Sequence, residues 1–156
     1  MTIEETLNIE LKKVADDLRK SFADNNVNAT GRLSNSLEVI TKQINNSING
    51  KLLAERYIDT VDTGRNANKT NSGGLLTAIR EWLRFGKYGL PNTEAVARAI
   101  TANISKRGSY LSRNKIDRKI VSGVVNDIRI ANILKVLGIQ AESEIKKNII
   151  NLTKSF

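Results

Sequence analysis

The N-terminal segment carries one unbroken apolar stripe, and this stripe limits the folds that the chain can adopt. Large apolar residues recur at intervals of three and four from Ile3 to Phe22, which places them on one face of an α-helix. Thr2 followed by Glu5 predicts a capping box at its start, and residues 24–26 predict its end. The helix has to bury this face, either against the core of its own chain or, alternatively, on a neighbouring subunit.

The amount of apolar material is sufficient for a core within the chain. The protein has 156 residues, of which 40% are hydrophobic and only 4% aromatic, so we expect one domain (1–156) with an aliphatic core. No apolar run approaches the ~18–20 residues that span a bilayer, and the acidic N-terminus does not resemble a signal peptide. We therefore expect no contact with a membrane and synthesis in a cytoplasm.

Two residue types are missing, and their absence excludes several kinds of chemistry. The sequence has no cysteine, which excludes disulfides, a thiolate nucleophile and a zinc site of the cysteine type. It also has no histidine, the commonest general base and transition-metal ligand. Any catalysis would depend on carboxylates, Lys, Ser or Tyr.

The next segment predicts a polar turn and a β-hairpin. Residues 29–36 are polar, and Gly31 suits an unusual backbone conformation there. Residues 37–44 are β-capable, Asn49-Gly50 is a strong hairpin-turn signal, and residues 51–57 would form the returning strand. The apolar residues 52–54 of this segment are equally compatible with a helix. The pattern therefore predicts one small antiparallel sheet.

The remainder of the chain predicts helices. An exposed loop at 66–74 precedes a helix over about 74–85, in which Trp82 is expected to point into the core. A further helix starts after residues 91–94 and ends at Gly108. From 114 onward the pattern is helical, with Gly138 expected to break or bend the run. The predicted fold class is α+β and helix-dominated, with long N- and C-terminal helices.

Positive charge is concentrated in the middle of the chain. Residues 56–119 contain 13 Lys or Arg and 5 Asp or Glu, a surplus of +8 out of +9 for the whole chain. Such asymmetry predicts a surface that meets an anionic partner.

The order of the motifs resembles one protein family. Thr30-Gly31-Arg32-Leu33-x-x-Ser36 is followed by the hairpin and by Tyr57-x-x-x-Val61-Asp62-x-Gly64-Arg65. A helix with Leu76-x-x-Ile79-x-x-Trp82-x-x-Phe85-Gly86 and the segment Ile104-Ser105-Lys106-Arg107-Gly108-Ser109 come next. This arrangement, over residues 30–113, resembles the neck and tail-completion proteins of tailed bacteriophages, a head–tail joining family of minor virion proteins. The family's Pro-rich loop is Asn-rich here, and residues 114–156 form a C-terminal helical extension to the 1–113 core.

The resemblance implies a structural protein rather than an enzyme, with no cofactor. It implies a homo-oligomeric ring, six- or twelve-fold, at the junction of capsid portal and tail, made in the bacterial host cytoplasm and incorporated into the virion. The implied partners are portal, adaptor or tail proteins and, without sequence specificity, the phage DNA. The positions that carry the family pattern are Thr30, Gly31, Tyr57, Asp62, Gly64, Trp82 and Gly108.

A ring threaded by DNA needs a positive or neutral lumen, because duplex DNA carries one charge per ~1.7 Å of its axis. Lys and Arg scattered over loops and helix faces suit sliding contacts better than aromatic stacking does. The candidates are Arg65, Lys69, Arg80, Arg84, Lys87, Lys106, Arg107 and Arg113. The alternative is that they form solvated helix faces or salt bridges between subunits, with Asp59, Asp62 and Glu81 as partners.

Two further functions remain open on the sequence. A free basic protein that binds duplex DNA without specificity is one, although no basic recognition helix is evident. The other is a magnesium-dependent nuclease that uses Asp59 and Asp62, which would share a face of a helix. Arg56 and Arg65 flank this pair, so an ion-pair cluster is the simpler interpretation.

Overall fold

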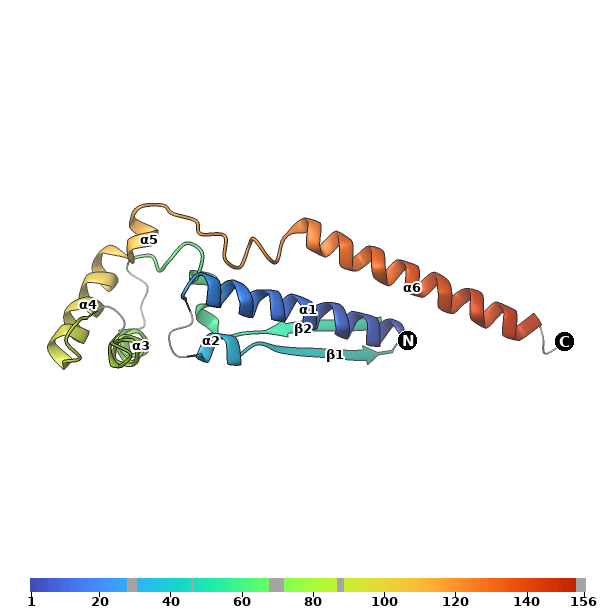
Figure 1. Cartoon of the computed structure of the whole chain (residues 1–156), viewed down its shortest axis with the longest axis horizontal. Coiled ribbons are helices and arrows are strands. Elements are labelled where there is room, and N and C mark those ends of the chain that lie inside the picture. The colour runs from blue at the N-terminus through green and yellow to red at the C-terminus, as the bar shows by residue number, and fades with distance from the viewer. Residues whose placement is uncertain (28–30, 46, 68–71, 87–88, 154–156) are drawn as a thin grey trace.

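A computed structural model describes residues 1–27, 31–45, 47–67, 72–86 and 89–153 (Figure 1). It begins with helix α1 (Ile3–Asp24). The Thr2 hydroxyl accepts the backbone N–H of Glu5 at 3.1 Å, and the Glu5 carboxylate accepts the N–H of Thr2 at 2.7 Å. The predicted helix and its capping box are therefore confirmed.

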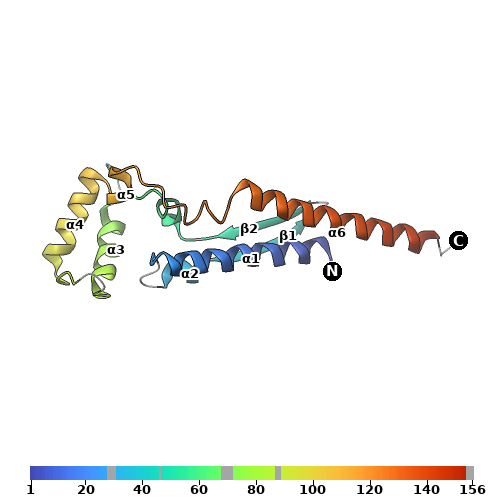
Figure 2. The ribbon, with the colours of Figure 1, turned by 45° about the horizontal axis from the view of Figure 1, so that its top comes forward.

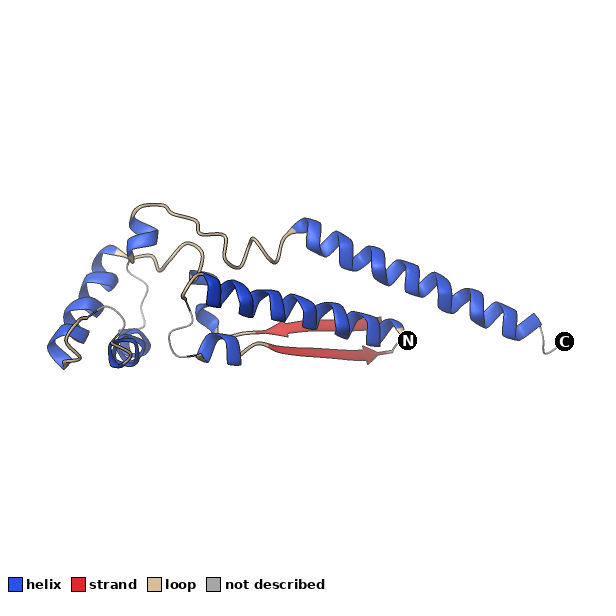
Figure 3. Ribbon diagram, in the orientation of Figure 1, coloured by secondary structure: helices blue, strands red, loops and turns tan. Residues whose placement is uncertain are grey.

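A two-stranded antiparallel sheet of β1 (Glu38–Ile44) and β2 (Ser47–Leu53) runs along one side of α1 (Figure 3). The register pairs Ile44 with Ser47, so the two strands are joined between these residues, and Asn45 has a positive φ of 54°. The hairpin prediction is correct, but the turn at Asn49-Gly50 is wrong, because both residues belong to β2.

Close packing against α1 explains why Gly50 lies inside a strand. A Cβ atom at Gly50 would lie 2.6 Å from Leu11 Cδ1 and 2.9 Å from Leu7 Cδ2. Only a residue without a side chain lets β2 approach the helix this closely. Gly50 is therefore needed for the close contact between helix and sheet. The sequence alone does not distinguish such a glycine from the glycine of an Asn-Gly turn.

The core lies between α1, the hairpin and the chain that returns along the other side of α1. Its fully buried side chains are aliphatic apart from one phenylalanine, and they include three residues of the predicted α1 stripe. They are Val14, Ala15, Leu18, Phe22, Leu33, Leu37 and Ile120. The stripe thus packs on the core of its own chain, as expected.

Short elements connect the hairpin to its neighbours. Gly31 precedes α2 (Arg32–Asn35) with a φ of 73°, which confirms the unusual backbone expected there. The preceding Thr30 lies outside the described residues. After β2 the chain forms the 3-10 helix η1 (Arg56–Thr60) in place of a continued strand, so the predicted extension of β2 to residue 57 is wrong.

Helices α3 (Ser72–Arg84) and α4 (Glu94–Arg107) pack against each other at one end of the molecule (Figure 2). Thr93 caps α4 by accepting the N–H of Val96, and Gly108 ends it with a φ of 81°. Both helices agree with the prediction, but α3 starts at Ser72, so the loop predicted at 66–74 is wrong for its last three residues. Residues 68–71 of that loop lie outside the described residues. The short helix α5 (Tyr110–Arg113) follows.

Residues 114–126, called the strap below, were expected to be helical, and this prediction is wrong. The strap runs from α5 back along α1 in a series of turns, with Lys115 and Lys119 at positive φ (Figure 1). The apolar residues spaced by four in the strap do not form a helix face. Instead, Ile120 enters the core and Val124 packs beside it. The Ser21 hydroxyl donates to the Ile120 carbonyl at 2.9 Å and ties the strap to α1.

The last element is helix α6 (Asp127–Thr153), a single helix of 27 residues. It passes through Gly138 without interruption, so the predicted break is wrong; one glycine costs a helix only about 1 kcal/mol. An ion pair between Arg129 and Asp17 at 2.9 Å joins α6 to α1. Beyond the chain N-terminus α6 projects away from the rest of the molecule (Figure 1).

The architecture is helix-dominated α+β with one antiparallel hairpin and long helices near both ends, as predicted. In the described part of the chain, none of the helices combines the length and the apolar character that a bilayer crossing requires.

Candidate nucleic-acid interface

The segments Gly64-Arg65 and Gly108-Ser109, far apart in sequence, meet in the structure. The Ser109 N–H donates to the Arg65 carbonyl at 2.8 Å, and the Arg65 N–H donates to the Ser109 hydroxyl at 2.9 Å. The Ser112 hydroxyl adds a bond to Asn66 Oδ1 at 2.6 Å. Two of the motif segments noted in the sequence therefore form one junction.

Glycine is required on both sides of this junction. Gly64 has a φ of 78°, and a Cβ atom there would lie 2.1 Å from Ser109 Oγ. A Cβ atom on Gly108 would lie 3.1 Å from the Arg65 carbonyl oxygen. Neither contact is visible from a sequence pattern, which shows only that each glycine precedes a polar or basic residue.

Four of the eight basic candidates gather around the junction. Lys106 and Arg107 occupy the last turn of α4, where cations complement the negative end of the helix dipole. Arg113 ends α5, and these three side chains are exposed. Together with the half-buried Arg65 they form what we call the basic corner.

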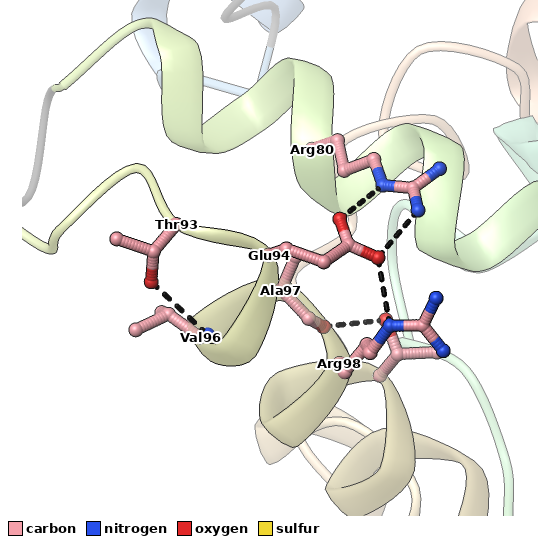
Figure 4. A network of polar contacts seen from close by, with 7 residues as sticks. Arg80, Thr93, Glu94, Val96, Ala97 and Arg98 are labelled. Carbon is pink, nitrogen blue, oxygen red and sulfur yellow. Dashed lines mark hydrogen bonds and ion pairs between the residues drawn. The ribbon is translucent and has the colours of Figure 1, made fainter.

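Arg80 belongs to a separate network that joins α3 to α4 (Figure 4). Its guanidinium donates to both Glu94 oxygens, at 2.8 and 2.5 Å, and Arg98 donates to Glu94 at 2.7 Å. The hydrogen bond from Arg80, assisted by Arg98, lowers the pKa of Glu94 to about 2, and the same bond raises the pKa of Arg80. Arg80 therefore joins α3 to α4, and its guanidinium is not positioned to bind a phosphate.

Of the three remaining candidates, the structure describes only Arg84. Arg84 is exposed at the end of α3, close in sequence to the start of α4, whereas Lys106 lies at the opposite end of α4, on the order of 20 Å away along the helix. Lys69 and Lys87 lie outside the described residues. Among the described candidates, Arg84 thus lies apart from the basic corner.

Asp62 serves a purpose that the sequence did not indicate. Its carboxylate accepts the backbone N–H of Val121 at 2.8 Å and that of Ser122 at 2.9 Å. Partial burial alone would raise the pKa of Asp62, but the two N–H donors outweigh it, so that this pKa lies below its usual value. The predicted ion-pair cluster around Asp59 and Asp62 is thus replaced, at Asp62, by an anchor for the strap.

An apolar cleft of about 420 Å³ separates the α3–α4 pair from α2 and η1. Trp82 and Tyr57 line it and are only partly buried, so the expected core position of Trp82 is wrong. Arg32 also lines the cleft, with its guanidinium 2.9 Å from the Glu55 carboxylate and 3.8 Å from the Glu81 carboxylate. Burial and the Glu55 carboxylate raise the pKa of the Tyr57 hydroxyl.

Sequence reasoning also missed Arg118, which the strap presents near the end of α1. Arg118 donates its side chain to the Asn25 carbonyl at 3.0 Å and its backbone N–H to the Asp62 carbonyl at 3.1 Å. A helix over residues 114–126, as predicted from the sequence, does not indicate these contacts of Arg118.

Two observations bear on other functions. Among the described residues there is no group of three or more His, Cys, Asp and Glu side chains that could hold a metal ion. Comparison of the chain with protein-family models, curated protein sequences and solved structures gave no match.

Proposed function

We propose that this chain is a structural protein of a tailed-bacteriophage virion. It forms a ring at the junction of portal and tail, as part of the neck, collar or tail-completion assembly, and DNA passes through the ring. Six or twelve copies make the ring, together with portal, adaptor or tail proteins of the same particle. The protein is made in the bacterial host cytoplasm and performs no bond-making chemistry.

The observation that carries this proposal is the junction of Gly64-Arg65 with Gly108-Ser109. These are two of the motif segments on which the family resemblance depends. One backbone hydrogen bond, and a second bond from the Arg65 N–H to the Ser109 hydroxyl, hold them together. Arg65 and Ser109 lie 44 positions apart in the sequence. Their contact therefore gives two of the segments in the family pattern a shared structural role.

The exposed basic corner suits a surface that DNA slides past. Three of its residues are exposed and close together in the sequence, namely Lys106, Arg107 and Arg113. The one aromatic residue between them in the sequence is Tyr110, so this segment does not offer a series of aromatic rings on which bases could stack. Charges of this kind bind phosphates without reading bases. The alternative partner for the same charges is an acidic surface of a neighbouring subunit.

Many large apolar side chains are exposed on the single chain, which fits a protein that acts within an assembly. They include Phe85 (54%), Ile128 (74%), Leu134 (62%) and Ile145 (59%). Apolar surface of this extent on one chain commonly marks a contact with another protein.

The direct test is reconstitution. The recombinant chain is mixed with the portal and adaptor proteins of the same particle and examined by negative-stain electron microscopy, with the chain alone as the control. We expect rings only in the mixture. A chain that stays unassembled beside every structural protein of the particle, or intact infectious particles that lack it, would contradict the proposal.

The exposed basic corner also keeps a second function open, that of a free protein that binds duplex DNA without sequence specificity. It predicts micromolar affinity for duplex and a steep dependence on salt in the absence of any virion protein. Filter binding at low salt compares the chain alone with the assembled ring. A free DNA-binding protein retains duplex equally well in both forms, whereas the ring protein binds duplex more weakly alone than after assembly.

A nuclease based on Asp59 and Asp62 has little support from the geometry. Both Asp62 oxygens accept backbone N–H groups of the strap. A metal ion at Asp62 would compete with those bonds.

A further inference from the structure

Helix α6 presents an apolar face that the rest of the chain leaves open. One face, with Ile133 and Leu137, turns toward the body and is partly buried. A second face carries the residues Ala131, Leu134, Gly138, Ala141 and Ile145, at alternating spacings of three and four. Leu134 and Ile145 on it are 62% and 59% exposed. A helix with two apolar faces needs two neighbours, and the chain itself provides one.

The second half of α6 extends past the body of the chain (Figure 1). The side-chain amide of Gln140 donates to the Met1 carbonyl, so α6 passes the start of the chain at that point. Residues 141–153 continue beyond it (Figure 1). A helical end of this length is marginal in water without packing, because isolated helices shorter than about 12–15 residues are barely stable.

We propose that α6 pairs with α6 of a second copy of this chain, in antiparallel orientation, through the face that contains Leu134 and Ile145. The alternating three-and-four spacing is that of the a and d positions of a coiled-coil heptad, with Ala131, Gly138 and Ile145 at a. This proposal goes beyond the ring function and does not depend on it.

The charges beside this face select the antiparallel orientation. Lys135 and Glu142 each follow an a position by four residues, so both occupy the e position that borders the contact. In an antiparallel pair e positions face e positions, and Lys135 of one copy meets Glu142 of the other twice across the two-fold axis. In the single chain Glu142 forms an exposed ion pair with Lys146 at 2.6 Å, and Lys135 of the second copy would join or replace this partner. In a parallel pair each e residue faces the g residue five positions earlier in the other copy, so Lys135 would meet Ile130 and Glu142 would meet Leu137, neither of which is charged.

The charge register also determines which apolar residues meet. When Lys135 faces Glu142, Leu134 lies opposite Ile145 and Gly138 lies opposite Ala141. The two layers of large side chains, Leu134 with Ile145, then lie on either side of a centre of small residues. In the single chain the space beside Gly138 is open, because a Cβ atom there would have no neighbour within 4 Å. The projecting second half of each α6 then packs on the first half of the other copy. This contact stabilises residues 141–153, which are marginal in water without packing. The contact is two-fold symmetric, the commonest symmetry of protein pairs.

Cysteine cross-linking tests the orientation directly, because the natural chain has no cysteine. Leu134→Cys and Ile145→Cys chains are prepared separately, then oxidised alone and as a mixture. The proposal predicts a disulfide-linked dimer in the mixture and almost none in either chain alone, since a disulfide requires Cα atoms within about 7 Å. A homodimer of Leu134→Cys would overturn the antiparallel pair, and no cross-linking in any sample would overturn the pairing itself.

Charge reversal provides an independent readout on full-length, unlinked protein. Sedimentation equilibrium from about 1 µM to about 1 mM measures the dissociation constant over the relevant range. Lys135→Glu alone should weaken the pair about tenfold, because two attractive pairs become repulsive, and Lys135→Glu with Glu142→Lys should restore it. Failure of the double variant to recover would contradict the register.

An apolar variant with a matched control completes the test. Ile145→Gln should weaken the pair at least about tenfold, because it removes a buried side chain from both copies. Ile139→Gln is the control, since Ile139 is 60% exposed but lies on another side of α6. Equal effects of the two variants, or a wild-type chain that is monomeric throughout the concentration range, would overturn the proposal. Circular dichroism verifies that each variant retains its helix.

Discussion

The Asp62 carboxylate accepts the backbone N–H of Val121 at 2.8 Å, across 59 positions of sequence. This bond fixes the strap between the 3-10 helix η1 and helix α1, and the neighbouring Ile120 enters the core there. A carboxylate that accepts two backbone N–H groups is a strong anchor, because hydrogen bonds to charged groups contribute more than neutral ones.

Asp62→Asn should therefore loosen the strap. Asparagine retains one acceptor oxygen but turns an NH₂ group toward an N–H donor. We expect a loss of about 1–2 kcal/mol in the free energy of unfolding, discounted for partial exposure, and a Tm lower by roughly 2–8 °C. Asp59→Asn is the control, since Asp59 is exposed, and it should leave Tm nearly unchanged. Equal Tm values for Asp62→Asn and the wild type would contradict the anchor.

The same anchor predicts a dependence on pH. The folded-state pKa of Asp62 lies below the unfolded value of about 3.9, so its contribution is complete above that pH and disappears as the pH falls through the folded pKa. Urea unfolding from pH 7 to pH 2.5 should show the wild-type advantage over Asp62→Asn above about pH 5 and a shrinking advantage below about pH 4. An advantage that is constant over this range would mean that the ionised carboxylate is not responsible.

Gly50→Ala tests the contact between α1 and the hairpin. The added Cβ would lie 2.6 Å from Leu11 Cδ1, so either Leu11 changes rotamer or the helix moves away from the sheet. We expect a loss of about 1–3 kcal/mol, typical of an overfilled core. Asn49→Ala, at an exposed neighbouring position of β2, should change the free energy of unfolding by well under 1 kcal/mol. Chemical denaturation measures both.

Gly64→Ala tests the junction below the basic corner. The variant combines a positive φ with a Cβ that would lie 2.1 Å from Ser109 Oγ. Gly86→Ala shares the positive φ but has no neighbour within 4 Å of its Cβ, so it isolates the backbone strain of about 1–2 kcal/mol. Gly64→Ala should cost clearly more than Gly86→Ala in thermal unfolding. Similar costs would show that Ser109 moves away without penalty.

The sequence predicted well where one local signal had one physical meaning. The stripe from Ile3 to Phe22 and the capping box at Thr2 both describe a single helix, and both are present. The end of α4 at Gly108 was likewise readable, because a glycine after a basic last turn is a helix terminus in most contexts.

Prediction failed where a residue served a distant partner. Gly50 is needed because of Leu7 and Leu11, and Asp62 because of Val121, and neither relationship leaves a local pattern. The spacing of four in the strap is compatible with a helix, but the bonds from Asp62 hold that backbone in turns. The sequence also did not show that Arg80, one of the basic candidates, binds Glu94 and so does not belong to the basic corner.

The basic corner leads to a last prediction, on DNA. Lys106→Ala with Arg107→Ala removes two exposed cations from the end of α4 without touching a buried contact. If both contact phosphates, the slope of log K against log salt should become less steep by about 2, since each phosphate contact contributes roughly 0.9. Lys12→Ala with Lys13→Ala is the matched control, a pair of adjacent exposed lysines on α1 outside the basic segment, and it should leave the slope unchanged. Fluorescence anisotropy with a duplex of unrelated sequence, from low to moderate salt, measures all three proteins. Equal slopes for the two double variants would assign the basic corner to subunit contacts, and the ring reconstitution would then be expected to fail with Lys106→Ala and Arg107→Ala while succeeding with the α1 control.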